Sequence, residues 1–499
     1  MHTESTRWPR ATGAVIAVAA FAVLGLSTPA SAAVLIDPNA EGSITIHKFQ
    51  TPDTPTGLPN NGSEVDTSGA GLTPIDGIEF TVNQVNVIDL STNAGWEDAV
   101  DLAAVFDAAN AVGSITGAGF TLGADQVEVT AGGGVAVFDA LPVGLYLVRE
   151  TDASGQDPAI VTPAAPFLIS VPLTDPDNLD NWIYNVHVYP KNPVADVDKT
   201  VLDAGAIALG DDVVWTITAD IPNETATAFR VNDDLDARLD YVSTAVSLTG
   251  GTPALVLGTD YSVVPATATV GGPEVIVTFL PDGLAKLTAN PDKQVIIAIT
   301  TTVNAIGEIA NQADVFPNQA SIDSDSPLMT PGGVETKWGA FTIEKIDEDG
   351  AALAGAVFSI FASEADALAE TDPIELGGQT TFTADGSGLV TFSGLRYTDF
   401  ANNADLVDGD PGYRSYWVVE VQAPAGYELL AQPIEIVIDE VSTPAGIDLQ
   451  VGNVPSNAGF SLPFTGGAGT AWLYGLSIGG FLITVTLLVV LGRRRRTRA

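Results

Sequence analysis

Residues 43–48 read Ser-Ile-Thr-Ile-His-Lys, and residues 341–345, far along the chain, read Phe-Thr-Ile-Glu-Lys. Both runs alternate apolar and polar side chains, which is typical of a β-strand with one buried face. Similar short runs, bounded by Gly, Pro, Asn and Asp, fill most of the chain, and only the regions around 96–109 and 363–369 look helical. The sequence therefore predicts an all-β protein.

The two lysine-terminated runs open two copies of a weak internal repeat. Each copy continues with a run that ends in phenylalanine, Phe80 or Phe358, and later with a run that ends in Glu150 or Glu420. Between the copies, residues 194–333 follow a different pattern, and their last part, 326–334, has the Pro and Gly content of a linker. We expect three tandem immunoglobulin-like β-sandwich domains, which occupy residues 33–193, 194–333 and 334–458.

Composition excludes several classes of function. The 499 residues carry 62 acidic and 19 basic side chains, a formal net charge of −43, no cysteine and three histidines. So acidic a chain repels nucleic acid, and without cysteine it forms neither disulfides nor thiolate sites. Three histidines leave little material for a metal site or a Ser-His-Asp triad. We therefore expect no metal, no cofactor, no nucleic-acid partner and no conventional enzyme.

Both ends of the chain carry targeting signals. Residues 1–32 combine two arginines, a short apolar run and Ala30-Ser31-Ala32, which predicts a secretory signal peptide cleaved between Ala32 and Ala33. An N-terminal membrane anchor is disfavoured because the run is shorter than the roughly 20 residues that a bilayer needs. Within residues 459–499, the apolar stretch 471–491 precedes an arginine-rich tail, which predicts a transmembrane helix with the rest of the chain outside the cell.

Three of the seven lysines lie in phase with the apolar face of their strands. These inward lysines are Lys48, Lys199 and Lys345. Acidic residues in the same phase are Glu150, Asp233 and Glu420. Burial pushes a lysine toward the neutral amine and a carboxyl toward its protonated form, which supplies a nucleophile and a proton donor. A buried salt bridge is the simpler alternative.

Asparagines complete each candidate site. Asn192 and Asn453 lie inward on the last strands of the first and third domains, where an amine could attack the carboxamide, release ammonia and leave a Lys-Asn isopeptide bond. In the middle domain the strand phase favours Asn311. Asn318 lies 119 residues from Lys199, which is closer to the separation in related domains, and is the preferred candidate.

Three further motifs point to a family. The segment before the apolar C-terminal stretch resembles the LPxTG sorting signal and consists of Leu462, Pro463, Phe464, Thr465 and Gly466. Residues 182–191, which end in Val-Tyr-Pro-Lys191, resemble the pilin motif, and residues 416–427 resemble the pilin E-box around Glu420. The chain thus resembles a backbone pilin of Gram-positive sortase-assembled pili, with Cna-B domains first and third and a Cna-A-like domain between them. Val421 stands where the E-box usually has threonine, and the disulfide of many relatives is impossible here.

The resemblance implies a mechanism of assembly. A sortase would cleave between Thr465 and Gly466 and pass the Thr465 carbonyl to Lys191 of another subunit, since Lys191 is out of phase with Asn192 and should be reachable from outside. Lys48–Asn192, Lys199–Asn318 and Lys345–Asn453 would form autocatalytic internal bonds, promoted by the three acids. The implied protein is the major subunit of a secreted, cell-wall-anchored pilus that supports adhesion, with a transient membrane precursor. The alternative is a minor or tip pilin or a monomeric wall-anchored adhesin. Implied partners are a sortase, other copies of the chain, minor pilins and peptidoglycan, with host surface receptors as a further candidate.

Overall fold

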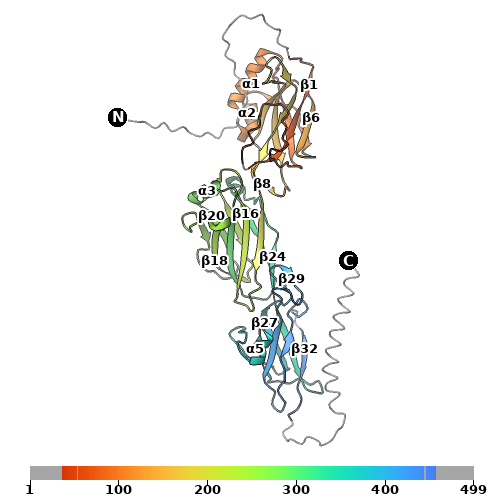
Figure 1. The fold of residues 1–499 in the computed structure, drawn as a ribbon, viewed down its shortest axis with the longest axis vertical. Coiled ribbons are helices and arrows are strands. Elements are labelled where there is room, and N and C mark those ends of the chain that lie inside the picture. Colours follow the sequence, from red (N-terminus) through yellow and green to blue (C-terminus); the bar gives the residue numbers. More distant parts are fainter. Residues whose placement is uncertain (1–35, 53, 443–445, 457–499) are drawn as a thin grey trace, which may run out of the picture.

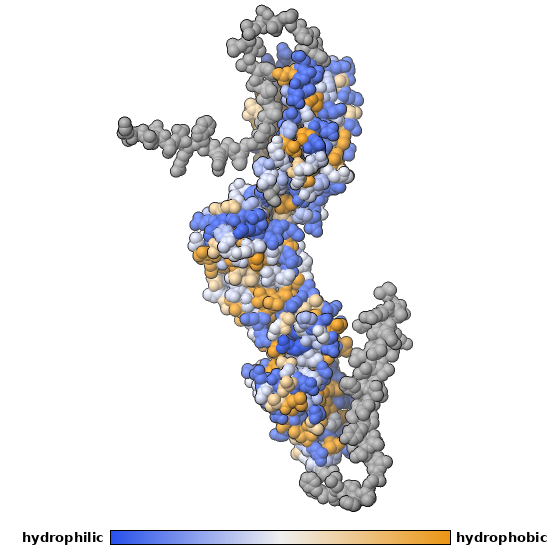
Figure 2. Space-filling model, in the orientation of Figure 1, coloured by the Kyte–Doolittle hydropathy of each residue, from blue (hydrophilic) through white to orange (hydrophobic). Residues whose placement is uncertain are grey.

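The computed structural model describes residues 36–52, 54–442 and 446–456, which form three β-sandwich domains in sequence order along the long axis (Figure 1). The predicted all-β class is confirmed. The signal peptide, the LPFTG segment and the apolar C-terminal stretch lie outside the described residues. Within the described part, no single helix is long and apolar enough to cross a membrane. Two consecutive helices, Asn93–Val105 and Ala108–Gly117, reach the required length and apolar composition only when they are counted together, and they are bent by 95° relative to each other. On the face in Figure 2, hydrophilic and hydrophobic residues are interspersed over the three domains.

The N-terminal domain packs two main sheets face to face. Its strands are β1 (Glu41–His47), β2 (Phe49–Gln50), β3 (Glu79–Asn86), β4 (Thr121–Leu122), β5 (Gln126–Val129), β6 (Val135–Pro142), β7 (Gly144–Asp152), β8 (Ala159–Ile160), β9 (Phe167–Val171), β10 (Leu173–Thr174), β11 (Trp182–Ile183), β12 (Asn185–Val188) and β13 (Lys191–Asn192). One sheet has the order β12-β1-β6, and the other has the order β4-β3-β7-β9 with β5 also paired to β3. The last strands β12 and β13 run parallel to β1 and β2, so the end of the domain lies beside its beginning.

Two helices cover the outer face of the β3–β7 sheet. They are α1 (Asn93–Val105) and α2 (Ala111–Gly117), joined by the 3-10 turn η1 (Ala108–Asn110). Leu102 and Ile115 pack there with Val85 and Leu147, which form a second cluster behind the sandwich core. Thr92 caps α1 because its hydroxyl accepts from the Gly95 amide. The helical region expected around 96–109 is present, but it begins earlier and α2 extends it.

The middle domain packs the sheet β15-β16-β21-β18 against the sheet β19-β20-β17-β23. Its strands are β14 (Val194–Ala195), β15 (Val197–Leu202), β16 (Asp212–Asp220), β17 (Arg230–Asp234), β18 (Leu239–Leu248), β19 (Tyr261–Val264), β20 (Glu274–Phe279), β21 (Gln294–Val303), β22 (Gly307–Asn311) and β23 (Ala313–Phe316). Its helices are η2 (Thr249–Gly251), α3 (Pro281–Thr288) and α4 (Gln319–Asp323). Buried positions alternate strictly along β16 and β21, as the period-two pattern requires.

The C-terminal domain is built on one long strand that it shares with the middle domain. Its elements are β24 (Val334–Ile346), β25 (Val357–Phe361), α5 (Glu364–Ala369), β26 (Phe382–Thr383), β27 (Leu389–Arg396), β28 (Phe400–Ala401), β29 (Ala404–Asp405), β30 (Tyr416–Gln422), β31 (Ile434–Ile436) and β32 (Leu449–Gly452). The start of β24 pairs with β22, and its later part pairs with β27 and, in parallel, with β32. The sheet β26-β25-β30-β31 faces it.

Neither junction between domains is an open linker. Val161, from the N-terminal part of the chain, is buried in the core of the middle domain. Ala208 of the middle segment is buried in the core of the C-terminal domain. The stretch 326–334, expected to be a linker, instead places Met329 in the middle-domain core, where it pairs with Val315. The Pro and Gly content of this stretch indicated a linker. The burial of a single methionine is nevertheless enough to hold the segment against the middle domain.

Candidate functional site

The N-terminal domain brings Lys48, Glu150 and Asn192 together in its interior. Lys48 Nζ lies 2.7 Å from Glu150 Oε2, and Asn192 Nδ2 donates to Glu150 Oε1 at 2.5 Å. The Ala164 backbone amide also donates to Glu150, at 3.0 Å. The ring of Phe80 lies beneath the lysine, 5.7 Å from Nζ to the ring centroid. All three polar side chains are buried, so the carboxylate is held between the amine and the carboxamide.

The C-terminal domain repeats this arrangement with Lys345, Glu420 and Asn453. Lys345 Nζ donates to Asn453 Oδ1 and lies 3.5 Å from Glu420 Oε1. Asn453 Nδ2 donates to both Glu420 oxygens at 3.0 and 3.1 Å, and the Leu430 amide donates to Glu420 Oε2 at 2.9 Å. The ring of Phe358 occupies the place of Phe80, 5.9 Å from the lysine. The amine here points at the carbonyl group of the asparagine.

The middle domain buries Lys199 against Asp233. Their Nζ and Oδ2 atoms are 2.8 Å apart, and Trp215 lies under the lysine at 5.9 Å. Asn311 is buried beside Asp233, close enough to help lower the pKa of that carboxyl, although burial outweighs it. Neither polar atom of the Asn311 side chain has hydrogen-bond geometry to a partner among the described residues. The carboxamide is therefore held near the acid without being bound by another group.

The structure favours Asn311 over Asn318 as the candidate partner of Lys199. Its side chain caps α4, since Oδ1 accepts from the Ser321 amide at 2.9 Å, and its Nδ2 donates to the Val161 carbonyl at 2.9 Å. Within the described chain, neither Lys199 nor Asp233 is a hydrogen-bond partner of this carboxamide. The criterion of sequence separation therefore favoured Asn318, which caps a helix. The criterion of strand phase favoured Asn311, which lies beside Asp233.

Burial shifts the pKa values of the three lysines and of Asp233 in the direction that amide chemistry needs. It lowers the pKa of Lys48, Lys199 and Lys345, and the adjacent carboxylates only partly oppose this effect. It raises the pKa of Asp233, against the charge of Lys199. A less basic lysine carries more free amine, and a protonated acid can polarise a carbonyl group.

Several residues of these sites were not identified from the sequence. The aromatic rings and the backbone amides of Ala164 and Leu430 belong to this group. Phe80 and Phe358 could have been found, because they occupy equivalent places in the repeat and pair directly with Glu150 and Glu420. The amides come from loops, whose approach to the acid leaves no periodic signal.

Lys191 faces the other way from Asn192. Asn192 is buried, whereas Lys191 is half-buried in β13, and its Nζ donates to the Tyr189 carbonyl at 3.3 Å. Burial lowers the pKa of Lys191. The predicted alternation therefore holds at this strand, and the side chain is partly accessible.

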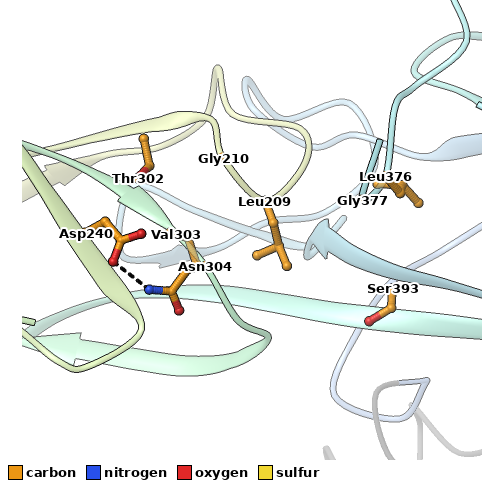
Figure 3. A pocket seen from close by; sticks show the side chains of 9 residues that line it. All are labelled: Leu209, Gly210, Asp240, Thr302, Val303, Asn304, Leu376, Gly377 and Ser393. Carbon is orange, nitrogen blue, oxygen red and sulfur yellow. Dashed lines mark hydrogen bonds between the residues drawn. The ribbon is translucent and has the colours of Figure 1, made fainter. Parts of the chain in front are cut away.

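A cavity of about 310 Å³ lies where the middle and C-terminal domains meet (Figure 3). Its lining residues are Leu209, Gly210, Asp240, Thr302, Val303, Asn304, Leu376, Gly377 and Ser393. Asn304 Nδ2 donates to Asp240 Oδ1 at 2.8 Å, so the one carboxylate of the lining already has a partner. These side chains offer no base next to a nucleophile.

Comparisons with known proteins give family matches for the first and third domains. The family model described as "Gram-positive pilin subunit D1, N-terminal domain" matches residues 39–193, and the one described as "Prealbumin-like fold domain" matches residues 339–451. The chain is 31% identical over 550 residues to "Fimbrial subunit type 1" of Actinomyces viscosus, with 99% of each chain covered.

Two solved structures are similar over most of their length. The full-length major pilin SpaD of Corynebacterium diphtheriae is 27% identical, with a TM-score of 0.65 over 84% of this chain and 98% of that one. The major pilin SpaA of the same organism, described with a modular pilus assembly and stabilizing isopeptide bonds, is 27% identical, with a TM-score of 0.55 over 83% of this chain and all of that one. The chain therefore belongs to the Gram-positive pilin family and is a structural subunit of a cell-surface pilus.

Proposed function

We propose that this chain is the major shaft subunit of a covalently polymerised, cell-wall-anchored pilus, and that internal Lys-Asn bonds brace each subunit. The observation that carries the proposal is the C-terminal site, where the Lys345 amine faces the Asn453 carboxamide and Glu420 holds the nitrogen that would leave. The stabilizing isopeptide bonds described for SpaA support it by similarity.

The proposed reaction balances within each site. The neutral lysine Nζ attacks the asparagine Cγ and a tetrahedral adduct forms, while in the N-terminal and C-terminal sites the acid is hydrogen-bonded to the nitrogen that leaves. The lysine nitrogen then loses a proton, the Cγ–Nδ2 bond breaks, and ammonia leaves with that proton. The products are an amide and the acid in its original form. The pairs are Lys48 with Asn192, Lys199 with Asn311, and Lys345 with Asn453.

Assembly uses a different lysine. A sortase would cleave after Thr465 and transfer its carbonyl to Lys191 of the next subunit, and the last subunit would pass to peptidoglycan. Lys191 supports this role because it is partly accessible and its pKa is lowered by burial, which favours the free amine as an acceptor. Polymerisation with other pilin subunits and minor pilins would follow from the same chemistry.

Intact-mass measurement of the mature chain tests the internal bonds. Three bonds release three ammonia molecules, so the mass should be about 51 Da below that of the linear sequence. Glu420→Gln should restore about 17 Da, and tryptic mapping should then lose only the Lys345–Asn453 cross-linked peptide. A full linear mass for the wild type would refute internal bracing.

Electrophoresis of cell-wall extracts tests polymerisation. Lys191→Ala should abolish the high-mass ladder, whereas Lys337→Ala, a change at a lysine that is paired with Glu308 and Glu335 and unrelated to the motif, should preserve it. A ladder that survives Lys191→Ala would contradict the shaft assignment and favour a minor pilin or a monomeric adhesin.

A further inference from the structure

Two of the three histidines of the chain meet beside the acceptor lysine. His47 ends β1 and His187 lies in β12, the strand that runs parallel to it. His47 Nε2 is 2.9 Å from His187 Nδ1, and the two rings stack with centroids 5.2 Å apart. His47 also stacks on Tyr189, at 4.7 Å and an interplanar angle of 10°. The three rings form one column on the outer face of the sheet.

Tyr189 connects this column to Lys191. Its ring packs on His47, and its carbonyl oxygen accepts from Lys191 Nζ at 3.3 Å. Its hydroxyl accepts from the Val65 amide at 2.6 Å, and the His187 amide donates to the Gly62 carbonyl at 2.9 Å. Tyr189 therefore contacts the histidine pair, the lysine and segment 62–65, and His187 also contacts that segment directly.

The contact between the imidazoles allows one hydrogen, not two. Facing nitrogens at 2.9 Å share a single N–H, and two N–H groups in this position would repel each other. Burial and His187 both lower the pKa of His47, and the carboxylate of Glu64 opposes them. On the neighbouring strand β6, the residue opposite His47 is Val135, which brings no charge that could compensate. Protonation of both rings should therefore open the pair.

We propose that the His47–His187 pair positions Lys191 through Tyr189, and that a second proton on the pair releases this arrangement and slows acyl transfer to Lys191. The inference rests on the proposed role of Lys191 as the acceptor. Both histidines would act as positioning residues, since the groups that link them to the amine are the ring and the carbonyl of Tyr189.

The test measures initial rates of ligation to Lys191 between pH 5 and 8, with a pilin-polymerising sortase and a peptide that contains Leu-Pro-Phe-Thr-Gly. One enzyme serves every variant, so its own titration cancels in the ratio of variant to wild type. His187→Ala should lower the rate at pH 7 by about tenfold, because His47, the ring on which Tyr189 packs, loses its partner. His187→Asn places an amide near the position of Nδ1 and should keep the rate within about twofold. Asn185→Ala, on the same strand, is the matched control.

The pH profile separates positioning from simple structural damage. Between pH 7 and 5, the wild type should lose about tenfold more rate than His187→Asn, which lacks the second titrating ring. NMR titration of the His47 ring gives an enzyme-free readout, and its pKa should rise toward the ordinary value in His187→Asn. Equal pH profiles for the wild type and His187→Asn would overturn the inference, as would wild-type rates for His187→Ala. If the wild type accepts no peptide at any pH, the proposed role of Lys191 fails instead, and an unchanged His47 titration in His187→Asn would then overturn the coupling of the two rings.

Discussion

The N-terminal and C-terminal cross-linking sites use the same three residue types on equivalent strands, yet the amine has a different partner in each. Lys48 contacts Glu150 at 2.7 Å, and the Asn192 carbonyl oxygen has no hydrogen-bond partner among the described residues. Lys345 instead donates to the Asn453 carbonyl oxygen. In both sites the acid accepts from the asparagine nitrogen and from one backbone amide. The acid is thus the fixed member of each site, and the lysine is the member whose contact varies.

The largest expected effect follows from replacing that fixed acid. Glu150→Gln and Glu420→Gln should each abolish one bond and lower the free energy of unfolding by about 4 to 5 kcal/mol, by analogy with disulfide loop closure. The bridged residues are 144 and 108 positions apart, so the two losses should differ by only about 0.3 kcal/mol. Denaturant unfolding and intact mass, measured on the same samples, check both numbers.

A matched control for these variants is Glu435→Gln on the neighbouring strand β31, where the side chain is exposed. It should change neither the mass deficit nor the stability by more than about 0.5 kcal/mol. A bond that still forms in Glu150→Gln or Glu420→Gln would show that the acid is dispensable in that domain, and the comparison between the two sites would lose its basis.

The middle domain extends the comparison, because two asparagines compete for one role there. Asn311→Ala should remove the bond, restore about 17 Da and cost about 4 to 5 kcal/mol. Asn318→Ala should keep the mass deficit and cost about 1 kcal/mol through the lost helix cap. The reverse result, with the deficit lost only in Asn318→Ala, would restore the residue that sequence separation favoured.

Strand periodicity was sufficient to predict most of this arrangement. The phase of Lys48, Lys199 and Lys345 predicted burial, and the structure places each against the acid expected for it. Phase works here because a strand turns each side chain to one of two faces, and an inward polar residue must meet a partner.

Other features depend on contacts that the alternation of side chains along a strand does not indicate. The cap formed by Asn318 and the burial of Met329 arise where a strand ends and the chain packs on a neighbouring domain. The meeting of His47 with His187 depends on the parallel register of the first and last strands, in which Thr45 pairs with His187. Register between strands so distant in sequence is set by the folded sheet, and a single sequence does not specify it.

A further expected effect concerns the pKa of Asp233 in the middle site. Burial raises this pKa and Lys199 opposes the shift, so Lys199→Met should raise it further while also preventing the bond. The native state then keeps a proton that the unfolded chain has lost, so the free energy of unfolding should fall as the pH rises above about 4, by at most about 1.4 kcal/mol per pH unit.

Asn311→Ala is the comparator, since it also lacks the bond but retains both ionisable groups. In Asn311→Ala, Asp233 can pass its proton to Lys199, so these two residues together bind the same number of protons in the native state as in the unfolded chain. The free energy of unfolding should therefore not change between about pH 5 and 9. Urea unfolding of both variants across this range checks the difference, and a flat curve for Lys199→Met would mean that Asp233 ionises as readily in the core as in water.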